Sequence, residues 1–161
     1  MSDPTKQMKT MSMVCLILGP MMIVLALVTH GALRLYDYAV EQQLPMETFG
    51  GTTDLLFGFA RSSFPWMLGL GVTFGVTGFI GRGGGQRGRK SLVVAGWIGT
   101  LGMIALTLLW VLEVHRLDMH WLWHVIGVVL HGVQLVAMIR GLLYLMSEKA
   151  IRAADGVAPQ P

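Results

Sequence analysis

The chain has 161 residues, of which 53% are hydrophobic and only 13% are charged. Ordinary soluble domains are about 45–50% apolar and about 25% charged, so this composition favours a membrane protein. Four membrane-spanning helices with short connections would use nearly all 161 residues, so we expect no separate soluble domain. The net charge of +3 and the pI near 9.4 would suit a nucleic-acid binder. The basic residues are segregated along the chain in a way that a membrane explains better, and we expect no nucleic-acid partner.

Four long apolar runs predict transmembrane helices over residues 11–33, 64–80, 92–112 and 121–146. A helix needs roughly 17–25 apolar residues to cross the hydrocarbon core of a bilayer. Because these runs fill most of the chain, we expect an all-α, multi-pass membrane protein, a four-helix bundle that forms one domain over residues 1–161. Cys15, the one cysteine, lies in the first run, which excludes an internal disulfide.

Two connecting segments stand out. Residues 34–63 predict an extracytoplasmic loop, in which Thr53 and Asp54 would cap a short helix lying on the membrane surface. Residues 81–90 predict a short basic loop between the second and third spans. Aromatic residues near the predicted span ends indicate a belt at one membrane interface; they are Tyr36, Tyr38, Trp66, Trp110, Trp121 and Trp123.

The distribution of charge predicts the orientation. Nine of the twelve basic residues fall on one side of the predicted spans: Lys6, Lys9, Arg82, Arg87, Arg89, Lys90, Arg140, Lys149 and Arg152. Short loops rich in Lys and Arg remain in the cytoplasm. We therefore expect both termini and the 81–90 loop to be cytoplasmic, in the inner membrane of a bacterium.

Glycines recur on one helical stripe of the second span and on another of the third. They are Gly71, Gly75 and Gly78, and Gly96, Gly99 and Gly102. Small residues let membrane helices approach closely. The stripes predict that spans two and three pack together as an antiparallel hairpin, with self-association through one stripe as the alternative.

All five histidines lie toward the extracytoplasmic end of the predicted spans. His30 and His124 are at matching depth, and His131 lies near the bilayer midplane at 1.5 Å per residue. His120, His124, His131 and Gln134 fall within a sector of about 80° on the fourth span. A polar stripe of this kind is expected to face the bundle interior or a water-filled cavity.

One interpretation of the histidines is a b-type haem. His30 and His124 would be its axial ligands, and His131 would substitute for either. Arg34 and Arg116 would pair with the haem propionates at the membrane surface.

A second interpretation is a zinc or copper site. His120 and His124, at positions i and i+4, would be completed by Glu113, His115 or Asp118. The stretch Met119–Val125 resembles the HxxxH on the last helix of the alkaline ceramidase and progestin-receptor superfamily, seven-helix zinc-dependent lipid amidases and their relatives. The resemblance implies that His120 and His124 bind zinc. This chain has four spans instead of seven, and no earlier span carries the family's Ser, His and Asp.

The third interpretation is an accessory or assembly subunit of a larger membrane complex, in which the histidines make interhelical hydrogen bonds and cap helix ends. Its partners would be the lipid bilayer and other membrane subunits or a second copy. No catalytic constellation is recognisable, which favours a protein that is not an enzyme. The alternative function is electron transfer or metal-dependent lipid hydrolysis by a haem, zinc or copper protein.

Overall fold

The computed structural model describes residues 4–42 and 50–156, and in these residues the chain is helical throughout its regular structure. The helices are α1 (Pro4–Glu41), α2 (Gly50–Arg82), α3 (Gly85–Arg116), α4 (Trp121–Met146) and the short α5 (Glu148–Ala154). Helices α1 to α4 are each long and apolar enough to cross a membrane. The all-α fold with four membrane-capable helices is therefore confirmed.

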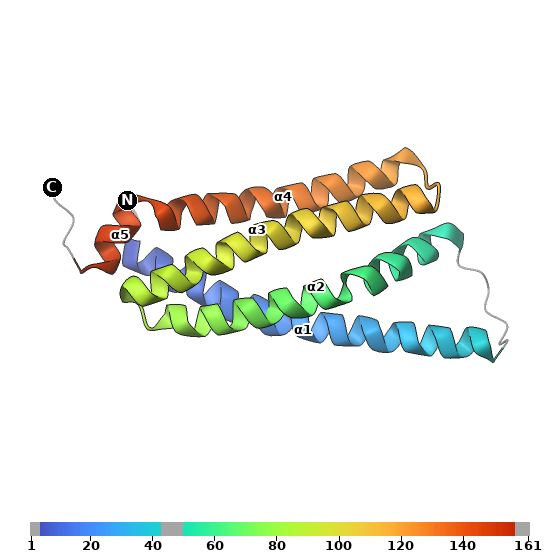
Figure 1. Cartoon of the computed structure of the whole chain (residues 1–161), viewed down its shortest axis with the longest axis horizontal. Helices are drawn as coiled ribbons and strands as arrows, with labels where there is room; N and C mark the ends of the chain where they lie inside the picture. The colour runs from blue at the N-terminus through green and yellow to red at the C-terminus, as the bar shows by residue number, and fades with distance from the viewer. Residues whose placement is uncertain (1–3, 43–49, 157–161) are drawn as a thin grey trace.

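The four long helices alternate in direction, so that the chain reverses at each end of the bundle (Figure 1). The start of α1, the α2–α3 connection and α5 lie together at one end, and nine basic residues belong to these segments and the end of α4. We call this the basic end. The opposite end, where α3 meets α4 and where α1 ends, carries His30, His115, His120 and His124, and we call it the histidine end.

The first two helices run far beyond the predicted spans and replace much of the predicted 34–63 loop. Helix α1 continues to Glu41 and α2 already begins at Gly50, while residues 43–49 lie outside the described part. The expected surface helix after Thr53 is instead the first part of α2. The apolar run marks the thickness of the hydrocarbon core, whereas a helix can continue into water on residues that favour it.

The predicted 81–90 loop is also mostly helical. Gly81 and Arg82 end α2, and α3 begins at Gly85, so that Gly83 and Gly84 alone connect them. Gly84 and Gly85 have φ angles of 68° and 62°. This left-handed region is accessible to glycine without steric cost, which permits so tight a reversal.

The glycines of α2 face α1, which corrects the expectation that they face α3. A methyl group added to Gly19 of α1 would lie 2.5 Å from the Gly75 nitrogen and 2.7 Å from the Gly71 oxygen. The buried Ser12 hydroxyl on α1 donates a 2.6 Å hydrogen bond to the Gly78 carbonyl. The backbones of α1 and α2 are therefore in direct contact, as small residues allow in membranes.

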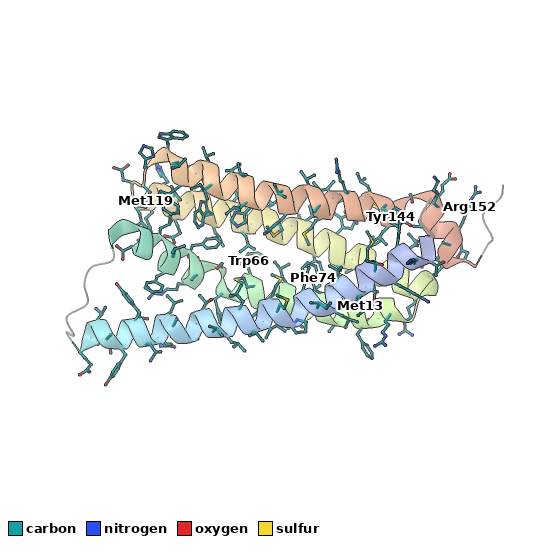
Figure 2. The ribbon with its side chains drawn as sticks, turned by 180° about the vertical axis from the view of Figure 1, so that it is seen from behind. Met13, Trp66, Phe74, Met119, Tyr144 and Arg152 are labelled. Carbon is teal, nitrogen blue, oxygen red and sulfur yellow. The ribbon has the colours of Figure 1, made fainter. Side chains whose placement is uncertain are left out.

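Helix α3 packs between α2 and α4, and the glycines of its predicted stripe, Gly96, Gly99 and Gly102, receive large side chains instead of a backbone. Leu70 of α2 lies over Gly102, and Leu142 of α4 lies over Gly96. The middle of the core is formed by Leu70, Phe74, Ala95, Met103 and Leu106. Figure 2 shows Phe74 among the side chains between the helices.

Trp110 belongs to the core at the histidine end and not to an interfacial belt. It is 7% exposed, clusters with Leu55 and Val114, and lies directly over Gly127 of α4. Its Nε1–H donates a 2.9 Å hydrogen bond to the Trp123 carbonyl. The indole therefore joins α3 to α4 through both packing and a satisfied polar group.

Helix α5 closes the basic end. Ser147 caps it by accepting a hydrogen bond from the Ala150 amide, and Ala150 and Ala154 are buried. It packs against α1, α3 and α4, and it lies beside the start of α1 in Figure 1. The chain thus brings its first and last described helices together.

Candidate functional site

His30 packs against an aromatic ring. Its imidazole stacks on Phe64 of α2, with ring centroids 4.5 Å apart and an angle of 24° between the planes. Arg34, one turn further along α1, is exposed. The structure therefore places His30 at the α1–α2 interface, where its contact is apolar.

His120 caps a helix. Its Nδ1 accepts a 3.3 Å hydrogen bond from the Leu122 amide, and its ring lies beside Trp121. Such a bond satisfies one of the backbone N–H groups that a helix start leaves without a partner. The HxxxH spacing that suggested a metal pair thus coincides with the start of α4.

His115 lies in the last turn of α3 and Asp118 in the short α3–α4 connection, and both are exposed. The Asp118 amide donates to the His115 carbonyl at 3.2 Å, and Asp118 has a φ angle of 47°. Aspartate is among the residues that tolerate this left-handed conformation. Both residues shape the turn between the helices.

Glu113, predicted as a metal ligand, and Arg116, predicted as a propionate partner, bind each other. The Arg116 Nε lies 2.8 Å from the Glu113 Oε2, and the Ser62 hydroxyl donates a 3.1 Å hydrogen bond to the Glu113 Oε1. The Glu113 side chain is 14% exposed. This cluster ties α2 to α3 at the histidine end, and sequence reasoning did not include Ser62 in it.

His131 lies between two aromatic rings. Its ring centroid is 6.2 Å from that of Trp110 on α3 and 5.9 Å from that of Phe59 on α2. Its Nδ1 is buried and makes no hydrogen bond of standard geometry with any described residue. His124, two turns earlier on α4, is half-buried.

The predicted polar stripe of α4 does not remain on the inner face throughout its length. Gln134 is exposed and makes no hydrogen bond within residues 4–42 and 50–156. In the most apolar 18-residue stretch of α4, only 6% of the residues are buried, whereas 39% are buried in the corresponding stretch of α3. Helix α4 is therefore the most outward-facing of the long helices, and it carries a polar amide on that exposed surface.

The structure does not assemble the predicted metal ligands into a site. Among the described residues, no three His, Cys, Asp or Glu side chains lie close enough together to hold a metal ion. The pairing of His30 and His124 on a haem is not tested by this geometry and stays a prediction.

No protein-family model, curated protein or solved structure matches the chain. The resemblance of Met119–Val125 to the zinc-dependent amidases thus has no support beyond its seven residues. Function must be argued from the fold and from individual side chains.

Proposed function

We propose that this protein is an accessory or assembly subunit of a larger membrane complex, with a structural and not a catalytic role. The observation that carries the proposal is the exposed amide of Gln134. It is the fourteenth of the 26 residues of α4, which puts it about 20 Å along the helix and near the middle of the membrane.

A primary amide facing hydrocarbon lacks the hydrogen bonds that water would give it, and leaving such a group unpaired costs several kcal/mol by water-to-alkane transfer. In membranes, glutamine side chains form hydrogen bonds across helix interfaces instead. A neighbouring helix that supplies a donor or acceptor would satisfy the amide. A second membrane protein is therefore a better neighbour for this surface than lipid alone.

The residues around Gln134 suit a helix partner. Leu130, Gln134 and Ala137 follow one another at steps of four and three, so they share a stripe, and all three are exposed. Such a stripe offers an apolar side chain, a polar one and a small one to an approaching helix, the combination found where membrane helices associate.

The proposal includes the orientation. The basic end carries the nine basic residues, and the rule that Lys and Arg remain inside puts this end in the cytoplasm. In a Cys15→Ser background, single cysteines at Arg87 and at Asp118 test this. A membrane-impermeant maleimide added to intact cells is expected to label position 118 and not position 87, and the opposite pattern would reverse the orientation.

Photo-crosslinking in the native membrane tests the role as a subunit. A benzoylphenylalanine in place of Gln134 is expected to capture one protein species, whereas the same group in place of Val133 is expected to capture lipid. Val133 is 68% exposed and lies 100° away on the same helix. Protein adducts at neither position would contradict the proposal.

Elemental analysis decides between this role and the haem or metal alternatives. The protein would be purified in mild detergent without metal-affinity resin. Near-stoichiometric iron, zinc or copper would make the histidine end a metal or haem centre, and would replace the structural role with electron transfer or hydrolysis.

A further inference from the structure

An apolar groove lies between α1 and α4 in the half of the bundle near the basic end. It has a volume of about 180 Å³ and is lined by residues of all four long helices, among them Met11, Cys15, Phe74, Gly96, Met138 and Leu142. Helix α1 packs along α2 and α4 packs along α3. Since α2 and α3 pack against each other between them, α1 and α4 are the outer helices, and they form the two sides of the groove.

The lining excludes an ordinary small-molecule site. Small-molecule pockets measure about 300–1,000 Å³ and present a few polar groups that orient the ligand. Here the polar side chain is Thr10, and its hydroxyl is already bonded to the Lys6 carbonyl at 2.9 Å. A narrow groove without an orienting polar group, inside the membrane, fits a hydrocarbon chain.

Arg89, a cation that pairs with no carboxylate in the described part of the chain, lies at the end of this groove. The Arg89 Nη1 donates a 3.0 Å hydrogen bond to the carbonyl of Leu145, a residue that lines the groove. The Arg89 Nε and Nη2 both donate to the Gln86 Oε1. These acceptors are neutral, and two of the five guanidinium N–H groups remain for another ligand.

Among residues 4–42 and 50–156, the acids of the basic end do not neutralise Arg89. Glu148 pairs with Arg152 at 3.4 Å, and Asp155 accepts a 2.5 Å hydrogen bond from the Gln86 amide. Asp155 therefore reaches Arg89 only through the Gln86 side chain. A half-buried guanidinium with free donors is the group that binds a phosphate most readily.

We propose that the groove between α1 and α4 binds an anionic phospholipid, with an acyl chain along the apolar lining and the phosphate on Arg89. Basic sites between membrane helices at the cytoplasmic surface bind acidic headgroups in this manner. The site is separate from the exposed stripe around Gln134, so it does not depend on the subunit role.

Lipid retention measured by native mass spectrometry tests the proposal. The protein would be reconstituted in vesicles of equal parts phosphatidylglycerol and phosphatidylethanolamine and then released into mild detergent. We expect one retained phosphatidylglycerol, preferred by about five-fold, the effect of one basic residue at a membrane surface. Arg89→Gln is expected to abolish the preference, and Arg89→Lys to restore part of it, which separates lost binding from misfolding.

Two matched controls isolate the site. Arg87→Gln removes the same charge from an exposed position two residues away and should leave the preference unchanged. Gly141→Leu fills the groove against the flexible end of Met11, whereas Gly132→Leu adds the same side chain where nothing lies within 4 Å. Gly141→Leu should remove the retained lipid and Gly132→Leu should not.

Three results would overturn the inference. An equal loss of preference in Arg87→Gln and Arg89→Gln would show a diffuse charge effect. Full retention in Gly141→Leu would show that no acyl chain occupies the groove. A benzophenone attached to Cys15 that captures a protein in the native membrane, and no lipid, would make the groove a helix-docking site.

Discussion

The contact between α1 and α2 leads to a quantitative prediction for Gly19→Ala. An added methyl group would lie 2.5 Å from the Gly75 nitrogen, whereas ordinary van der Waals contact begins at 3.4 Å, so the helices must separate by about 0.9 Å. A gap of this size forfeits a quarter to a half of each dispersion contact along the crossing. Since both opposing groups are backbone, no side-chain rotation can relieve the clash.

We expect a cost near the upper end of the 1–3 kcal/mol typical of overpacking. Alanine is better than glycine in a helix by about 1 kcal/mol, which leaves Gly19→Ala destabilised by about 2 kcal/mol. Gly31→Ala is the matched control, because a methyl group at Gly31 of the same helix meets nothing within 4 Å. That variant keeps only the gain in propensity, up to about 1 kcal/mol.

Unfolding by SDS in mixed micelles, followed by far-ultraviolet circular dichroism, measures both variants against the wild type. The two apparent free energies of unfolding should differ by about 3 kcal/mol, which is the overpacking cost alone, because both variants share the gain in helix propensity. Equal stabilities of Gly19→Ala and Gly31→Ala would refute the close approach of α1 and α2.

Three further predictions use the same unfolding assay. Ser12→Ala removes the hydrogen bond to Gly78 and should cost about 0.6 kcal/mol, the average for polar pairs between membrane helices; no change would show the bond to be dispensable. His120→Ala should lower the free energy of unfolding by about 1 kcal/mol, because it removes the N-cap of α4. His120→Asp should keep wild-type stability, because aspartate is a good N-cap but a different metal ligand; an equal loss of stability in both variants would favour a role for His120 as a ligand. Trp110→Phe should cost about 0.5–1.5 kcal/mol, the net contribution of one hydrogen bond, because the Trp123 carbonyl keeps its partner within α4 but loses the indole donor, and an unchanged stability would contradict that bond.

The existence of the four long helices could be predicted from the sequence, but not their ends. An apolar run reports the thickness of the hydrocarbon core, and the helices continue past it. Leu35 and Val40 of α1, for example, are helical although they lie outside the predicted span. Aligned glycines likewise predict that another helix can approach closely. Which helix approaches depends on how α1 crosses α2, and this could not be predicted from the single sequence.

The candidate site shows the same division. Glu113 and Arg116 are three residues apart on a helix, a spacing that predicts an ion pair directly from sequence. Their third partner, Ser62, is 51 residues away and required the structure. The sequence is compatible with His120 as a metal ligand or as a cap, because both roles use a histidine at the start of a helix, and the structure shows the cap.

The contact of α5 with α1 constrains the order in which the protein is made. Helix α5 begins 107 positions after α1 ends, and at about 5–20 residues per second the ribosome needs roughly 5–20 s to cover that distance. During this interval α1 has α2 beside it but lacks the helix that closes the basic end. The newly inserted chain therefore passes through an open form that lasts for seconds, in which lipids and proteases on that side of the membrane have access to the start of α1.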